Sequence, residues 1–173
     1  DANIVDINAG GFIEAGSGAV TIDSAVGGVT IDDSVDGGSV AVNSAAAISL
    51  ATDADVTSDA GAITLNAVTT LTSDGTSALA ATGGKVDLDS VGDMTISGGV
   101  TTANQAFEAD AGGATLTIDT AAVTTGAGVG AIDLDANIVD INAGGFIEAG
   151  SGAVTIDSAV GGVTIDDSVD GGS

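Results

Sequence analysis

Acidic and amide side chains recur at one position of a short repeated motif, and they are the residues of this chain best suited to chemistry. The motif is Gly-x-Φ-x-Φ-Asx, where Φ is aliphatic and Asx is Asp or Asn. One copy departs from it, because the segment QAFEAD (105–110) has Gln in place of Gly and Phe107 in the first aliphatic slot. Oxygens at such a position can cap backbone N–H groups in a turn, or they can hold Ca²⁺. The Asx residues are Asp23, Asn43, Asn66, Asp89, Asp110, Asp135 and Asp157.

Because the motif repeats, we expect these seven side chains to form a structural column, called here the Asx column, at the end of a strand in every repeat. Stacked carboxylates repel one another, and the two Asn residues dilute that repulsion and can form an amide ladder. We favour turn capping as the role of the column. A row of metal sites along one edge is the alternative.

A second acidic group is the densest in the sequence, and it supplies the calcium candidates. Three of its members precede Gly37-Gly38, and two more are expected to stack near them on the next repeat. Their spacing matches neither an EF-hand loop nor a calcium β-roll array, so a solvated acidic corner is the simpler interpretation. The candidates are Asp32, Asp33, Asp36, Asp53 and Asp55.

Catalysis is not expected, although paired carboxylates can hydrolyse glycosidic bonds. The chain has no His, Cys, Trp or Tyr and only one basic residue, which excludes nucleophilic triads and leaves neither Trp nor Tyr to stack on a sugar. We therefore predict no catalytic residue, and no cofactor apart from Ca²⁺. The basic residue, Lys85, is expected to make a weak ion pair at the surface.

The net charge limits the classes of partner that the chain can bind. The formal charge is −24, which excludes nucleic acid as a partner because phosphate contacts require Lys and Arg. It also disfavours anionic membrane surfaces, and no uncharged apolar run is long enough for membrane insertion.

The composition predicts a narrow core. Hydrophobic residues make up 44% of the chain, but aromatic residues make up only 2%. Such a core is one or two small side chains deep, as in an elongated fold. Phe12, Phe107 and Phe146 are expected to fill it.

Two nested repeats organise the chain. Residues 1–39 recur identically as residues 135–173. This predicts that residues 1–173 are one continuous segment of a longer tandem array, with a unit of 1–134 and a second copy beginning at 135. Within the unit, the first Φ of each motif recurs at intervals of roughly 20–25 residues, which is the range of a solenoid coil. These positions are Val20, Val40, Ile63, Val86, Phe107, Ile132 and Val154.

The even spacing favours Phe107 over a rival register that places this slot at Leu116. Two further apolar positions follow each first slot, separated by Gly, Asp and Ser turns. Alternation with period two predicts strands with one buried face. Three short strands per coil of about 22 residues, and six coils per 134-residue unit, indicate an all-β parallel β-helix, or β-solenoid.

The runs AITLNA (62–67), KVDLDSVGDMTISGG (85–99) and GAIDLDANIVDINAGG (130–145) resemble the repeats of filamentous-haemagglutinin-type bacterial exoproteins. The resemblance implies a right-handed β-helix, export from the cell, and a role in adhesion. It places the chain in the structural shaft of an extracellular filament or adhesin on a bacterial cell surface. The expected partners are further copies of the repeat, end to end or in tandem, and cell-surface or matrix ligands.

One alternative architecture shares the acidic composition and the repeat length. Giant calcium-dependent adhesins are built of β-sandwich repeats of comparable size. Sandwiches normally carry a core aromatic and lack a short sub-period. The period of about 22 residues therefore favours the solenoid.

Overall fold

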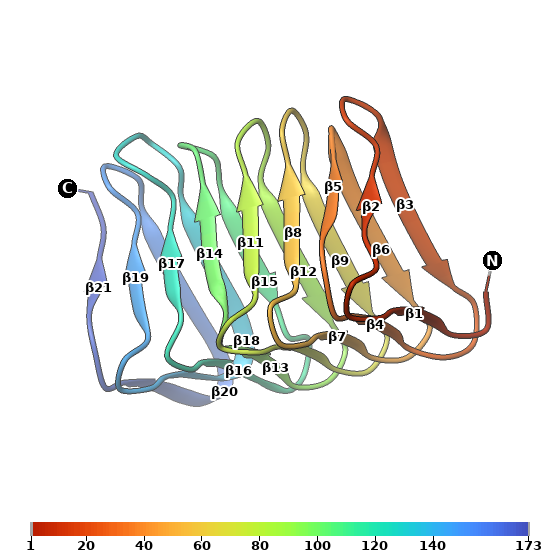
Figure 1. The fold of residues 1–173 in the computed structure, drawn as a ribbon. Coiled ribbons are helices and arrows are strands. Elements are labelled where there is room, and N and C mark those ends of the chain that lie inside the picture. Colours follow the sequence, from red (N-terminus) through yellow and green to blue (C-terminus); the bar gives the residue numbers. More distant parts are fainter. Residues whose placement is uncertain (1, 173) are drawn as a thin grey trace.

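The computed structural model describes residues 2–172, which wind into stacked coils with three strand positions per coil (Figure 1). All strand pairs in this range are parallel, and they join coils that are adjacent along the axis. A β-sandwich would require antiparallel sheets, so the sandwich alternative is not favoured. The part of the chain that is described contains no helix able to cross a membrane.

The first face carries the Gly-x-Φ-x-Φ-Asx motifs. Its last two strands are long, and each continues around a corner into the second face. The strands are β3 (Ala19–Ser24), β6 (Ser39–Ser44), β9 (Ile63–Ala67), β12 (Val86–Ser90), β15 (Phe107–Asp110), β18 (Ile132–Ile141) and β20 (Val154–Ile165).

The second face is built of shorter strands that follow the first corner. They are β1 (Val5–Ile7), β4 (Val29–Ile31), β7 (Ile48–Leu50), β10 (Leu71–Ser73), β13 (Met94–Ile96) and β16 (Thr115–Ile118).

The third face closes each coil and forms a sheet of its own. Its strands are β2 (Ile13–Glu14), β5 (Val35–Gly37), β8 (Asp55–Ser58), β11 (Ala78–Ala81), β14 (Gly99–Thr102), β17 (Ala122–Thr124), β19 (Phe146–Glu148) and β21 (Val169–Asp170).

The predicted register of the first face is confirmed. Each first slot pairs with the next one along the axis, from Val20 opposite Val40 to Ile132 opposite Val154. The first slot for which Phe107 and Leu116 were the alternatives belongs to Phe107, which pairs with Val86 and Ile132. Leu116 pairs with Met94 on the second face. The intervals between successive slots therefore correspond to the six coils predicted for the unit 1–134.

The core is a narrow stack of aliphatic side chains that point inward from all three faces. Alternation along β3 and β12 buries every second residue, as expected for strands with one apolar face. Phe107 is fully buried, in agreement with its predicted role. Phe12 and Phe146 are 69% and 36% exposed, so their prediction as core residues was wrong. Both lie at or beside a corner, where the strand alternation no longer sets the direction of a side chain.

The glycine that opens six of the seven motifs has a steric reason, and Gln105 stands at this position in the remaining copy. It lies at the corner where the third face turns into the first, and backbone segments of successive coils meet there. A Cβ atom at Gly84 would collide with the backbone of Gly61, and one at Gly38 would collide with Ser17. Glycine therefore allows the coils to approach closely at this corner.

Candidate functional site: the first face and its corner groove

The seven members of the Asx column stack in register on the outer side of the first face. The pairing runs without a break from Asp23 opposite Asn43 to Asp135 opposite Asp157. In β3 and β12, the Asx residue is the penultimate residue of the strand, not the last one. The column is thus an outward row within the sheet, and not a row of turn residues.

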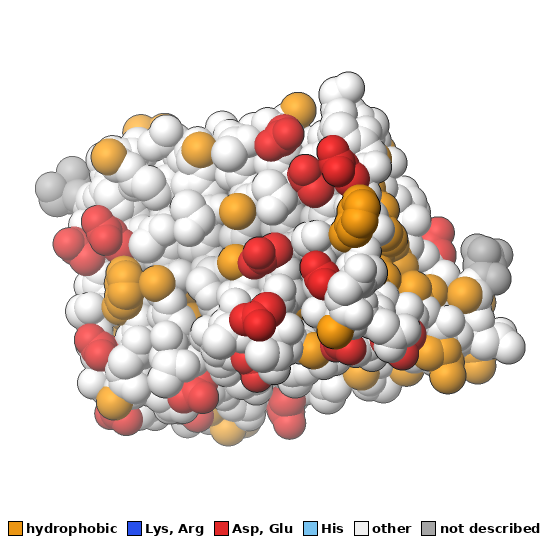
Figure 2. Space-filling view, viewed as in Figure 1, with side chains coloured by type: hydrophobic (Ala, Val, Ile, Leu, Met, Phe, Trp, Pro, Cys, Tyr) orange, Lys and Arg blue, Asp and Glu red, His pale blue; other side chains and the backbone are white. Residues whose placement is uncertain are grey.

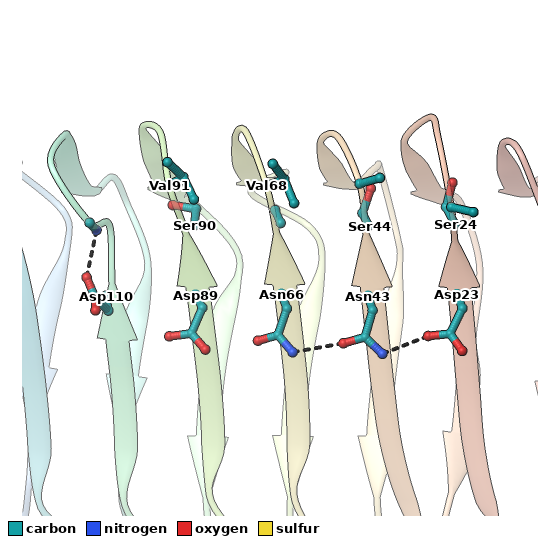
Figure 3. Close-up of a pocket in the computed structure, with 14 residues that line it drawn as sticks. Asp23, Ser24, Asn43, Ser44, Asn66, Val68, Asp89, Ser90, Val91 and Asp110 are labelled. Atoms are coloured by element: carbon teal, nitrogen blue, oxygen red, sulfur yellow. Dashed lines mark hydrogen bonds between the residues drawn. The ribbon is translucent and has the colours of Figure 1, made fainter. Parts of the chain in front are cut away.

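The first three members of the column form a hydrogen-bonded ladder (Figure 3). Asn43 Nδ2 donates to Asp23 Oδ1 at 2.7 Å, and Asn66 Nδ2 donates to Asn43 Oδ1 at 2.8 Å. Each amide gives its N–H to one neighbour, and the Asn43 oxygen accepts from the other. Carboxylates stacked at this spacing would repel one another. With amides in the column, the same spacing gives a row of side-chain hydrogen bonds instead.

Turn capping by the column is seen at one member. Asp110 Oδ1 accepts a hydrogen bond from the Gly112 N–H at 2.6 Å. The corner after the column is held instead by buried serines, which the sequence analysis missed. Ser24 Oγ donates to Gly27 O at 2.8 Å, and Ser44 Oγ donates to Ala47 O at 2.9 Å. Extending the alternation by two residues beyond the second Φ would have marked these serines as inward-facing.

The other four members of the column are carboxylates, and a second acidic row runs beside three of them. Asp87, Glu108 and Asp133 stack in register on the same face, two residues earlier in their strands. Burial is the first cause that raises the pKa of Asp89, and the charges of Asp87 and Asp110 raise it further. The pKa of Asp133 is raised by burial and then by the charges of Asp157 and Glu108.

Lys85 partly offsets this charge. Its Nζ lies 2.9 Å from Asp87 Oδ2 and 2.5 Å from Glu108 Oε2, so one ammonium group links the acidic row of two coils. The hydrogen bonds to Glu108 and Asp87 raise the pKa of Lys85. The Lys85 side chain is 39% exposed, so the ion pairs are partly screened by solvent.

The five calcium candidates do not come together as a group. Asp36 and Asp55 lie on strands of the third face, and Asp53 lies in a turn with a left-handed backbone (φ 63°). Asp33 accepts hydrogen bonds from Gly10 N at 2.7 Å and Ser34 N at 2.8 Å, and these bonds lower its pKa.

Two further observations concern the same candidates. Asp32 follows β4, and its N–H donates to Ile7 O of the preceding coil. Asp36 Oδ1 is buried and has no hydrogen-bond partner among the residues that the structure describes. Within residues 2–172, no three acidic side chains are arranged to hold one metal ion.

A groove of about 720 Å³ runs along the corner between the first and second faces. Its lower wall in Figure 3 is the Asx column from Asp23 to Asp110. Its other wall is an aliphatic row contributed by the residue that follows the column by two positions, and this row comprises Ala25, Ala45, Val68 and Val91. On the side of the molecule seen in Figure 2, by contrast with the ordered Asx column, acidic side chains are scattered among uncharged ones.

Comparison with known proteins adds no identity. No protein-family model matches the chain, and no curated protein or solved structure matches it either. The parallel β-solenoid therefore stands on the geometry described above. The likeness to filamentous-haemagglutinin-type proteins remains a likeness of repeat pattern.

Proposed function

We propose that this chain is part of the structural shaft of an extracellular bacterial filament or adhesin. The observation that supports this most strongly is that the solenoid runs through the recurring segment without interruption. Residues 1–39 recur as residues 135–173, and β18 pairs with β15 and β16 on one side and with β20 on the other. Leu134, near the start of β18, is fully buried. Tandem copies of this sequence can therefore join within one continuous stack of coils.

A continuous solenoid of this kind suits a shaft for physical reasons. Backbone hydrogen bonds between coils run along the axis, so lengthening the array adds reach without adding a hinge. The acidic surface keeps rods apart through charge repulsion. Further copies of the repeat are the first partner in this proposal, and ligands on host cells or in the matrix are the second. The adhesive role and the bacterial surface location rest on the resemblance of the repeats.

We include calcium in the proposal as a bridge between rods. The carboxylates of β12, β15 and β18 present two acidic rows to solvent, which a divalent cation can link across two molecules. Light scattering of a multi-unit array with Ca²⁺, with Mg²⁺ and after EDTA tests this. Bundling that requires Ca²⁺ and reverses with EDTA is expected. Identical scattering in all three conditions would remove calcium from the proposal.

The shaft is tested by measuring the length of arrays. Proteins with two and four 134-residue units are imaged by negative-stain electron microscopy. Each added unit is expected to lengthen a straight rod by roughly 29 Å, which is six coils at about 4.8 Å, at constant width. Flexible beads, or lengths unrelated to the number of units, would contradict a continuous shaft.

The location is tested separately. Antibodies against one unit are applied to intact cells of the source organism before and after mild surface proteolysis. Labelling of filaments outside the cell, lost after proteolysis, is expected. Labelling that requires permeabilised cells would overturn the extracellular part of the proposal while leaving the rod intact.

A further inference from the structure

The corner groove combines two walls of opposite character along the same axis. One wall presents the oxygens of Asp23, Asn43, Asn66, Asp89 and Asp110, one from each of five coils. The other wall is the aliphatic row, which is repeated at the same position of four successive coils. Figure 3 shows the polar row lying parallel to the row of Val68 and Val91.

The aliphatic wall is an exposed apolar surface on a strongly acidic protein. Val68 is 55% exposed and Val91 is 67% exposed, although each lies within two residues of a fully or nearly fully buried position. The row ends after Val91, because the next coil places Gly112 in the groove. The wall therefore has a defined length of four coils, or roughly 14 Å between its first and last members.

We propose that this groove binds a cationic amphipathic α-helix that lies parallel to the solenoid axis. The helix places an apolar stripe against the aliphatic row and Lys or Arg side chains against the Asx column. Charge complementarity identifies the partner, since the column carries carboxylates at Asp23, Asp89 and Asp110 and the whole chain has a charge of −24. This inference does not depend on the shaft proposed above.

The axial spacing favours a helix over an extended segment. Coils repeat at about 4.8 Å, and an α-helix rises about 5.4 Å per turn. Side chains on successive helical turns are therefore offset from the coils by only about 2 Å in total along the four-coil wall. An extended strand repeats its side chains on one face about every 6.7 Å, so it reaches the same offset after a single coil. A helix also forms its own backbone hydrogen bonds. It therefore needs none from the strands beside the groove, whose backbones already bond to one another.

Other occupants fit less well. A second copy of this chain brings its own charge of −24 to an acidic wall, which repels it. An oligosaccharide normally stacks its apolar face on an aromatic ring, and no aromatic residue lines the groove. A cation beside Asp89 offsets the repulsion from the charges of Asp87 and Asp110, which adds to the preference for a basic partner.

The apolar contact is tested with a synthetic peptide of about five helical turns, built from Leu and Lys, with the leucines on one helical stripe. Its dissociation constant is measured by isothermal titration calorimetry. Val68→Thr combined with Val91→Thr is expected to weaken binding about tenfold, because two apolar contacts are replaced by hydroxyl groups. The matched control is Val129→Thr, which changes an exposed valine outside the groove. Equal affinities for the double variant and the control would overturn the proposal.

The charge contact is tested with the same peptide at low and high salt. Asp89→Asn is expected to weaken binding several-fold at low salt, whereas Asp59→Asn, remote from the groove, is expected to have little effect. A peptide of the same composition, with its leucines scattered around the helix, is expected to bind at least tenfold more weakly. Equal binding of the scattered peptide would show general charge attraction and would contradict a groove-bound helix.

Sedimentation of the chain alone tests the competing occupant. The wild type and the Val68→Thr/Val91→Thr protein are expected to sediment alike, because end-to-end stacking of coils does not involve the groove. Self-association that disappears in the Val68→Thr/Val91→Thr protein would show that a second copy occupies the groove, and would replace the helix as the partner. All these substitutions are at exposed side chains, so the variants should fold, and circular dichroism of each variant checks this.

Discussion

The two ends of the Asx column place similar side chains at the same position but differ in how these side chains interact. In β3, β6 and β9 the column reads Asp23, Asn43, Asn66, and hydrogen bonds link the three side chains. From β12 onward the column consists of carboxylates alone, and the pKa of Asp89 is raised by burial and by neighbouring charges. We call these parts the amide half and the carboxylate half.

The difference shows what stacking does to a polar residue. A solenoid repeats one position at about 4.8 Å, so a single choice of residue is multiplied along the axis. Two charges at that distance repel by about 1 kcal/mol even in water. An amide carries both a donor and an acceptor, so the same spacing becomes a favourable contact. The carboxylate half lacks such donors in its column and relies on Lys85 in the neighbouring row.

Converting the amide half into carboxylates gives the largest expected effect. Asn43→Asp combined with Asn66→Asp removes both ladder donors and leaves a run of like charges. We expect the free energy of unfolding to fall by about 2 kcal/mol at neutral pH, as measured by urea denaturation at low salt. Asn8→Asp is the control, because it adds a charge at an exposed position outside the column. A double variant as stable as this control would show that the ladder contributes nothing.

Removing the cation from the carboxylate half should have a smaller effect. Lys85→Met leaves Asp87 and Glu108 without their shared partner, and we expect a loss of about 1 kcal/mol because the pair is partly exposed. A double-mutant cycle with Glu108→Gln measures the coupling directly. A coupling energy of zero would mean that the ion pair has no effect on stability.

Extending the amide half by one coil should be mildly stabilising. Asp89→Asn removes a charge that burial and two neighbouring carboxylates disfavour, and places an amide next to Asn66. We expect the free energy of unfolding to rise by about 0.5 kcal/mol at neutral pH. Asp59→Asn removes an exposed charge elsewhere and serves as the control. A loss of stability specific to Asp89→Asn would contradict the account of the carboxylate half.

The pH dependence should also report the crowding of charge around the carboxylate half. Because the folded-state pKa values of Asp89 and Asp133 are raised, these carboxylates bind protons at a higher pH in the folded protein than in the unfolded chain. Stability is therefore gained as the pH falls through these raised values, and the gain is complete below the ordinary value of 3.8. Asp33 has a lowered pKa, so its contribution is present above 3.8 and is lost as the pH falls through the lowered value.

The measurement is thermal unfolding between pH 7 and pH 3. The wild type should gain stability on mild acidification and lose it again at the acid end. Asp89→Asn combined with Asp133→Asn should remove most of the gain and leave the loss. An unchanged profile in this variant would assign the pH dependence to other carboxylates.

The coil architecture could be predicted from the sequence because it depends on period alone. Even spacing was enough to place Phe107 in the core and to assign Leu116 to another face, and both assignments are confirmed. Features at the corners were harder to predict. Alternation stops there, so neither the exposure of Phe12 nor the separation of Asp36 from Asp53 could be read from residue spacing.

The aliphatic wall of the groove was within reach of the sequence, although the groove itself was not. Val68 and Val91 each follow their Asx residue by two positions, so extending the repeat alignment past the column would have placed them in one outward row. The hollow between this row and the Asx column depends on how the chain turns at the corner, which residue spacing does not give.

The most direct test of the account is X-ray diffraction from oriented fibres of a multi-unit array. Stacked coils predict a meridional reflection at about 4.8 Å, which is the distance between strands along the axis, together with a longer repeat of roughly 29 Å for each unit. A meridian without the reflection from the strand spacing, or an axial repeat unrelated to six coils, would contradict a continuous solenoid and the rod built from it.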